Sequence, residues 1–220
     1  MIDKPHRFYH WPTYAQWAFI IITAIIVLLI FGIIIYLSIL HLTLLPFLLF
    51  PLTTILISFV DTPFNKLTKK LYYYAPLFIV EKKTGKYILH GGTFFDYLFV
   101  LGCRSRGIAN RKIVLMDLLN GLLNLIDEIE QEKSEKLTIS GTSYFFNERT
   151  ARRFGFDIQS PEVSQVILMM LNYLPITLSY SMIDGKLAFP KLNKIKKASI
   201  SGPKLVNEKD KILRLIERLQ

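Results

Sequence analysis

The sequence contains one cysteine, Cys103, and it has no lysine, arginine, aspartate or glutamate between Arg7 and Asp61. A single cysteine excludes an internal disulfide, which agrees with a reducing compartment. The uncharged interval is too long for an ordinary water-exposed segment. It consists mainly of isoleucine, leucine, valine and phenylalanine, and a hydrocarbon core of ~30 Å needs about 20 such residues for each helix. The sequence therefore predicts a two-helix transmembrane hairpin over residues 14–60.

The first crossing is expected over Trp17 to Leu40 and the second over roughly Leu42 to Val60. Pro51 lies inside the second crossing, where neighbouring helices and hydroxyl groups can satisfy the carbonyls that a proline frees. One alternative is a single kinked or re-entrant span. Another is a cleaved signal peptide, which is disfavoured by the length of the apolar block and the lack of a small-residue cleavage site after it.

Basic residues flank the predicted hairpin on both sides, and the turn inside it has no fixed charge. Lys4 and Arg7 precede it in the flank 1–13, and the lysines that follow it are Lys66, Lys69 and Lys70. Cytoplasmic flanks of membrane helices carry an excess of Lys and Arg, so both termini are expected in the cytoplasm. The predicted location is the inner membrane or plasma membrane, with more than one crossing.

Residues 61–76 combine those lysines with Tyr72, Tyr73 and Tyr74. Aromatic rings prefer the membrane interface, and lysines are attracted to anionic headgroups. The segment is typical of an interfacial helix that binds anionic inner-leaflet lipid at Lys66, Lys69 and Lys70. A plain connector with a solvated basic face is an equally open alternative.

Residues 77–220 alternate between strand-like and helix-like patterns, which predicts a cytoplasmic α/β (α+β) domain with a mixed sheet. The expected elements are a hairpin over 77–89, a strand or short helix over 96–102, an amphipathic helix over 113–129, a strand over 136–140, a two-turn helix over 147–155, a strand over 156–158, a helix that starts at 160, a second hairpin over 176–190, a strand over 196–201 and a closing helix over 205–219.

The stretch GCRSRGIANRK, residues 102–112, is expected to join a strand ending at Leu101 to a helix beginning near Ala109. The first amides of a helix have no partner within the helix and lie at the positive end of its dipole. Gly107 lets the backbone approach a ligand closely, and Arg104 and Arg106 can add charge-assisted hydrogen bonds to phosphate oxygens. The turn is therefore suited to a pyrophosphate group.

Six residues of this turn resemble the acetyl-CoA loop of GNAT-type N-acyltransferases, whose pattern is Arg or Gln, two residues, Gly, one residue, then Gly or Ala. They are Arg104, Ser105, Arg106, Gly107, Ile108 and Ala109. Residues 147–156, NERTARRFGF, are similar to the Asn-x-x-Ala helix of that family, which ends in Gly-Phe. The resemblance covers roughly Leu77 to Ile158. It implies that these six residues bind acyl-CoA and that an acyl group passes to an amine.

The resemblance has departures and names no catalytic base. The helix over 147–155 is about one turn shorter than in the family and lacks the tyrosine that often serves there as general acid. The residues after Ile158 have no evident counterpart.

His90 and Asp96 resemble the His-x4-Asp motif of glycerolipid acyltransferases, but here five residues separate them. His90 is a candidate general base, and a satisfied histidine in a hairpin turn is the favoured alternative. No cluster of cysteine, histidine and carboxylate residues has metal-ligand spacing, so the sequence supports no metal site.

The basic residues around Arg149, Arg152 and Arg153 suit anionic lipid or a nucleotide. Nucleic acid is disfavoured because aromatic residues are not interleaved with them. Two classes of function follow. One is an integral membrane protein with a cytoplasmic acyl-CoA-dependent N-acyltransferase-like domain. The other is a non-catalytic membrane-anchored sensor or protein-interaction module that binds a nucleotide or a protein partner.

Overall fold

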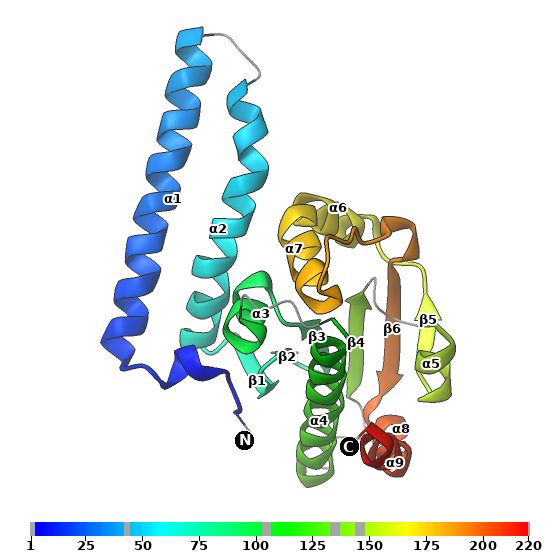
Figure 1. Cartoon of the computed structure of the whole chain (residues 1–220). Coiled ribbons are helices and arrows are strands. Elements are labelled where there is room, and N and C mark those ends of the chain that lie inside the picture. The colour runs from blue at the N-terminus through cyan, green and yellow to red at the C-terminus, as the bar shows by residue number, and fades with distance from the viewer. Residues whose placement is uncertain (1–2, 42–44, 103–106, 133–136, 144–147, 220) are drawn as a thin grey trace.

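The computed structural model describes residues 3–41, 45–102, 107–132, 137–143 and 148–219. Figure 1 shows a pair of long antiparallel helices beside a body in which helices pack on a sheet. The pair consists of α1 (Thr13–His41) and α2 (Leu45–Leu67), and a short 3-10 turn, η1 (Arg7–His10), precedes it. An N-terminal apolar helix followed by a mixed-sheet α+β body is thus confirmed.

Helix α1 has the length and composition of a membrane crossing. Its residues Thr13–Leu40 form the one unbroken helix, among the described residues, that is long and apolar enough to cross a bilayer. Large apolar side chains cover its surface; Leu28, Leu29 and Ile39 are 69%, 61% and 74% exposed. Such a surface is costly in water and stable in hydrocarbon.

The body is built on a six-stranded sheet with the order β1-β2-β3-β4-β6-β5 in the described part of the chain. Its strands are β1 (Leu71–Ala75), β2 (Phe78–Lys83), β3 (Lys86–Gly91), β4 (Thr138–Ser143), β5 (Asp157–Gln159) and β6 (Lys196–Ser201). Strands β3 and β4 are parallel, and the other neighbouring pairs are antiparallel. The sheet is therefore mixed, as predicted.

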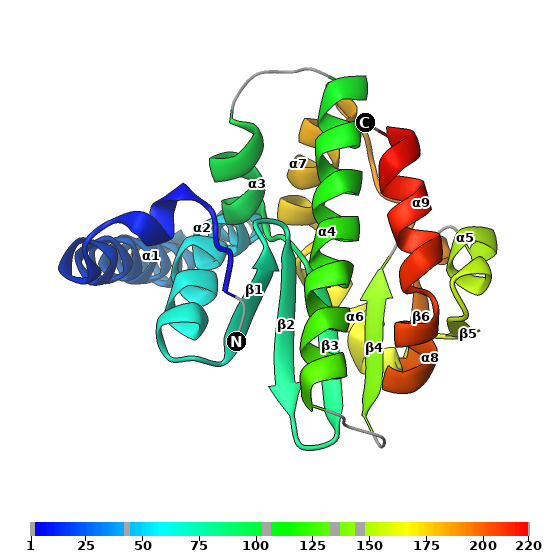
Figure 2. The same cartoon turned by 90° about the horizontal axis from the view of Figure 1, so that it is seen from below.

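The helices of the body are α3 (Phe94–Leu101), α4 (Ile108–Glu132), α5 (Glu148–Arg153), α6 (Val163–Leu171), α7 (Tyr173–Asp184), α8 (Gly202–Asn207) and α9 (Lys209–Leu219), with a 3-10 turn, η2 (Leu192–Lys194), before β6. Figure 2 shows α4 and α9 side by side on one face of the sheet. The core lies between them and the strands, and its fully buried side chains include Leu125, Ile126, Ile139, Leu205 and Ile212.

Helix α4 lies close to the sheet at Gly121. A Cβ atom added there would lie 2.4 Å from both Cβ and Cγ of Phe78 on β2, which is closer than carbon atoms can pack. Gly121 therefore sets the distance between α4 and the sheet.

Residues 61–76 form neither the interfacial helix nor the plain connector that the sequence suggested. Helix α2 continues to Leu67, and the tyrosines form β1, where Tyr73 and Tyr74 are fully buried. Successive side chains of a strand point to opposite faces. Tyr74 accordingly donates to Glu128 on α4 (2.8 Å) and Tyr73 to Asp96 on α3 (2.7 Å). The interfacial helix and the plain connector are both wrong, because a tyrosine run suits a buried strand equally well.

Residues 96–102 were predicted to form a strand or a short helix, and the anion-loop prediction assumed the strand. Residues up to Leu101 belong to helix α3, which confirms the helix alternative. Thr93 precedes the helix, and both its N–H and its hydroxyl donate to Asp96 Oδ2, at 2.6 and 2.8 Å. This reciprocal capping fixes the start of α3. The strand prediction is wrong because an apolar run of this length fits both structures, and the cap decides between them.

The predicted second hairpin over 176–190 is also wrong, because its first half is helix α7. Thr177 and Ser181 donate their hydroxyls to carbonyls four residues earlier, which is possible only in a helix. Gly185, with a φ of 71°, ends α7 as a left-handed cap and does not form a hairpin turn.

The other elements agree with the sequence, apart from their ends. The first hairpin, the helix α4, the short helix α5 and the strands β4, β5 and β6 are confirmed. Helix α6 begins at Val163, after the capping residue Glu162, and not at Ser160. The predicted closing helix is divided into α8 and α9.

Candidate functional site

The predicted anion loop is described from Gly107 onward. Arg104, Ser105 and Arg106 lie outside the described residues. Gly107 has a φ of 45°, in the region that favours glycine, and α4 begins at the next residue. Ile108 is 85% exposed and Ala109 is also exposed. The first turn of α4 therefore has open surface beside a glycine turn.

The C-terminal end of α7 lies against this turn. Arg111 donates to Asp184 Oδ1 from both Nε (3.1 Å) and Nη2 (2.9 Å), and Asn110 donates to the carbonyl of Met182 (2.7 Å). A carboxylate is favourable at the positive end of a helix. A phosphate group bound at Gly107 would have to share this end of α4 with Asp184.

His90 and Asp96, which the sequence places close together, do not pair. His90 Nε2 lies 3.8 Å from Glu81 Oε2 on the neighbouring strand, and 45% of the His90 side chain is exposed. Partial removal from water lowers the pKa of His90, and the charge of Glu81 opposes this shift. The imidazole is therefore neutral at pH 7 and able to accept a proton.

Asp96 instead forms the centre of a buried hydrogen-bond network, called here the Asp96 network, with His6, Tyr9, Tyr73 and Thr93. Asp96 Oδ1 accepts from His6 Nε2 (3.0 Å) and from the Tyr73 hydroxyl (2.7 Å). The Tyr9 hydroxyl lies 3.1 Å from that of Tyr73. Burial and the nearby carboxylate raise the pKa of Tyr73, so its phenol stays protonated. Because Asp96 and His6 are 0% and 4% exposed, the network ties the N-terminus to the body and is closed to a substrate.

Asp117 on α4 is a carboxyl group with a perturbed pKa. Its Oδ2 accepts from the Leu77 N–H at 2.5 Å. Burial raises the pKa of Asp117 from 3.8 to about 6, and the hydrogen bond from Leu77 opposes the shift. The folded state therefore binds this proton more tightly than the unfolded state. The resulting stabilisation is fully present below about pH 3.8 and is lost as the pH rises through about 6.

Replacing Asp117 by asparagine should remove this pH dependence, because an amide oxygen still accepts from Leu77 and carries no charge. The Tm of Asp117→Asn minus that of the wild type should be more positive at pH 8 than at pH 5. After allowance for partial exposure we expect a change of on the order of 0.5–1 kcal/mol, or about 1–4 °C. Thermal unfolding of both proteins at both pH values measures this change. If the Tm difference between Asp117→Asn and the wild type were the same at pH 5 and pH 8, the raised pKa of Asp117 would be contradicted.

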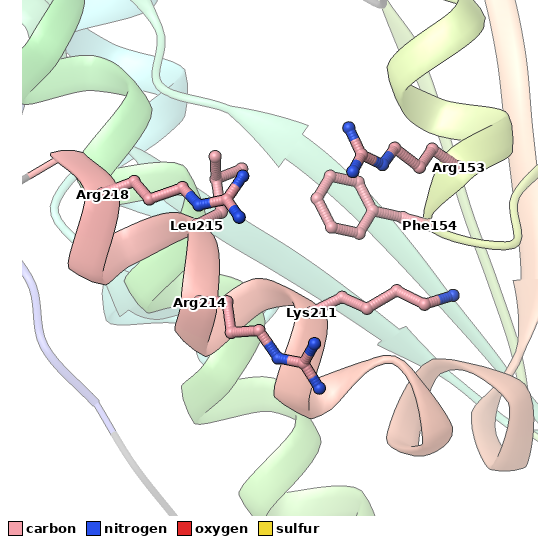
Figure 3. Close-up of a pocket in the computed structure, with 6 residues that line it drawn as sticks. All are labelled: Arg153, Phe154, Lys211, Arg214, Leu215 and Arg218. Atoms are coloured by element: carbon pink, nitrogen blue, oxygen red, sulfur yellow. The ribbon is translucent and has the colours of Figure 1, made fainter.

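A basic pocket of about 370 Å³ lies between α5 and α9 (Figure 3). It is lined by Arg153, Phe154, Lys211, Arg214, Leu215 and Arg218. Lys211 pairs with Glu208 at 2.7 Å. Arg153, Arg214 and Arg218 are exposed and have no ion pair with any described residue. Cations that gather around a hollow repel one another unless an anion lies between them.

The sequence indicated only part of this pocket. Arg153 was among the basic residues expected to bind a nucleotide or lipid, but the side chains on α9 were not. Residues 211, 214, 215 and 218 have the spacing of a single helix face, and this spacing would have revealed the stripe. Only the fold shows that the stripe faces Arg153 and Phe154.

In the described part of the chain no three histidine, cysteine or carboxylate side chains are grouped as metal ligands. The chain matches no family model, no curated protein and no solved structure.

Proposed function

We propose that the chain is an integral membrane protein whose cytoplasmic domain is an acyl-CoA-dependent N-acyltransferase-like enzyme. The observation that carries the proposal is the glycine turn at Gly107, which opens directly onto the exposed first turn of α4. The backbone N–H groups of that turn have no partner within the helix, and a pyrophosphate can accept from them.

The order of elements supports the same proposal. After the turn come a long helix, the strand β4, the short helix α5, which is followed by Gly155 and Phe156, and the strand β5. This is the order that the resemblance to GNAT-type N-acyltransferases implies. The helix α3 before the turn departs from it. His90, neutral and half-exposed, is able to take the proton of an attacking amine.

Contacts across the base of the helix pair support two crossings. The Lys4 N–H donates to the Tyr73 carbonyl (2.7 Å), and His6 donates to Asp96. These contacts join the residues before α1 to those after α2. If α1 crosses the bilayer, the chain has to return through α2 to make them. The basic flanks then favour a cytoplasmic location for both ends at the inner or plasma membrane, with Lys66, Lys69 and Lys70 near anionic lipid.

Acetyl-CoA should raise the Tm of the purified full-length chain in detergent. At a hundredfold excess over Kd the stabilisation is about 2.7 kcal/mol, or about 5–10 °C for a chain of this size. Ile108→Glu should abolish the shift, because the new carboxylate repels phosphate. The fold should tolerate it, since Ile108 is 85% exposed and acidic residues are favourable at a helix N-terminus.

Ile108→Gln is the matched control, because glutamine has the size of glutamate without its charge. This variant should keep the Tm increase with acetyl-CoA. Gly107→Glu is less informative, since a Cβ there would lie 3.3 Å from the Asp184 carbonyl and would strain the turn. No shift with saturating acetyl-CoA, or an equal shift in Ile108→Glu, would sink the acyl-CoA proposal.

The pocket between α5 and α9 favours a second candidate, a membrane-anchored module that senses a nucleotide or a related phosphorylated ligand. Three arginines can bind phosphate oxygens, and the ring of Phe154 offers a surface for a planar base. This pocket contains no group with evident acid or base chemistry, so a binding role fits it better than catalysis.

A titration with ADP separates the two candidates. The sensor predicts a Tm increase with ADP that Arg214→Glu removes and Ile108→Glu leaves unchanged. Lys204→Glu makes the same charge change at an exposed position of α8, outside the pocket, and should keep the shift. If Arg214→Glu and Lys204→Glu reduced the ADP-induced Tm increase equally, net charge, and not the pocket, would attract the ligand.

A further inference from the structure

Helix α6 exposes an apolar face in the body of the protein. None of its residues is buried. Large apolar side chains line the face, and their exposed fractions range from 51% to 76%: Val163, Ile167, Leu168, Met170 and Leu171. Leu187 and Phe189, just after α7, are 71% and 61% exposed. An apolar surface of this extent in water marks an interaction site or a membrane contact.

The composition of α6 and α7 is that of a membrane-embedded segment. No aspartate, glutamate, lysine or arginine occurs between Val163 and Ile183. The two helices are bent by 73° at a short break and together satisfy the length and apolarity of a span.

Three hydroxyl groups of α7 are satisfied within the helix. The hydroxyls of Thr177, Ser179 and Ser181 each donate to the carbonyl four residues earlier, at 2.7 to 2.9 Å. Internal satisfaction of this kind is what a low-dielectric surrounding requires.

Helices α6 and α7 lie beside the helix pair. Figure 1 shows both helices on the same side of the sheet as α1 and α2, level with the middle and lower part of that pair. Helix α7 contacts α2 directly. A bilayer crossed by α1 would therefore extend sideways to α6. The exposed lysines Lys186, Lys191 and Lys194 follow the apolar segment and suit anionic headgroups.

We propose that α6, with Leu187 and Phe189, is inserted into the leaflet through which α1 and α2 enter the bilayer, so that the body is held at the membrane by a third, non-spanning contact. The inference rests on the proposed crossing by α1 and is independent of acyl transfer. It places the body of the protein against lipid.

The test uses the full chain with Cys103→Ser, reconstituted in vesicles of phosphatidylcholine and phosphatidylglycerol. A nitroxide is attached to a single cysteine introduced by Leu168→Cys, Leu213→Cys or Ile26→Cys. Leu213 is a matched control, an exposed leucine on α9, and Ile26 reports on α1. Collision rates with oxygen, which concentrates in lipid, and with a neutral nickel complex, which stays in water, are measured for each label.

At position 168 we expect an oxygen-to-nickel ratio several-fold higher than at 213 and similar to that at 26. A ratio at 168 equal to that at 213 overturns the inference, since α6 then lies in water. Low collision rates with both reagents also overturn it, since a protein surface then covers α6. A water-like ratio at position 26 would instead refute the membrane anchor itself, and the inference with it.

Discussion

Replacing Asp96 by alanine should lower the free energy of unfolding by about 3–5 kcal/mol, because it removes the shared acceptor of a buried network and leaves several donors buried without a partner. The change removes the acceptor of His6 Nε2, the Tyr73 hydroxyl and both donors of Thr93. Each donor left without a partner costs about 1–3 kcal/mol. The loss also removes the cap of α3, so this helix should fray at its start.

Chemical or thermal unfolding of the full chain in detergent measures this effect. Asp61→Ala is the control. It removes an exposed aspartate whose carboxylate accepts a hydrogen bond from the Asn65 side chain, and it should lower the free energy of unfolding far less. His6→Ala should lower the stability little further in an Asp96→Ala background, since the effects of substitutions within one hydrogen-bond network are not additive. Equal losses in Asp96→Ala and Asp61→Ala would contradict the role of the Asp96 network.

Gly121→Leu is expected to lower the free energy of unfolding by about 3 kcal/mol, because a side chain forces α4 away from the sheet. The Cβ atom of that side chain would already lie 2.4 Å from Phe78 Cβ. A change of the Phe78 rotamer would not relieve this overlap, because it does not move Phe78 Cβ. The gain in helix propensity over glycine is only about 1 kcal/mol and does not offset the overlap.

Asn120→Leu is the matched control, since Asn120 is the exposed neighbour on the same helix. It should leave the stability nearly unchanged or raise it slightly through better helix propensity. Gly121→Ala should fall between the two. If Gly121→Leu were as stable as Asn120→Leu, the close packing of α4 on β2 would be wrong.

The sequence predicted the parts of the fold whose pattern is local. The helix α4 shows its apolar stripe over many turns, and β2 and β3 are joined by Thr84 and Gly85 at a tight turn. The two segments that form helices where strands were assumed, α3 and α7, are short and mostly apolar, and they pack against other elements of the fold. At such positions tertiary contacts decide between strand and helix, although Thr93 with Asp96 did carry a capping signal.

The candidate sites were predictable to a smaller degree, because they join distant residues. The turn at Gly107 could be found from its own residues, whereas the Asp184 carboxylate beside it comes from α7. His6 and Asp96 are 90 residues apart, and no local pattern relates them. The pocket likewise needs α5 and α9 to be placed together by the sheet.

The contact between His6 and Asp96 also sets an order of assembly. The N-terminal segment is synthesised first, and its partner is added only after both long helices are complete. His6 therefore stays undocked while the helix pair forms, and the contact then closes a loop of 90 residues. The entropy of closing a loop grows only slowly with its length. Insertions within the helix pair should thus be tolerated more readily than substitutions of His6 or Asp96, whose contact closes the loop.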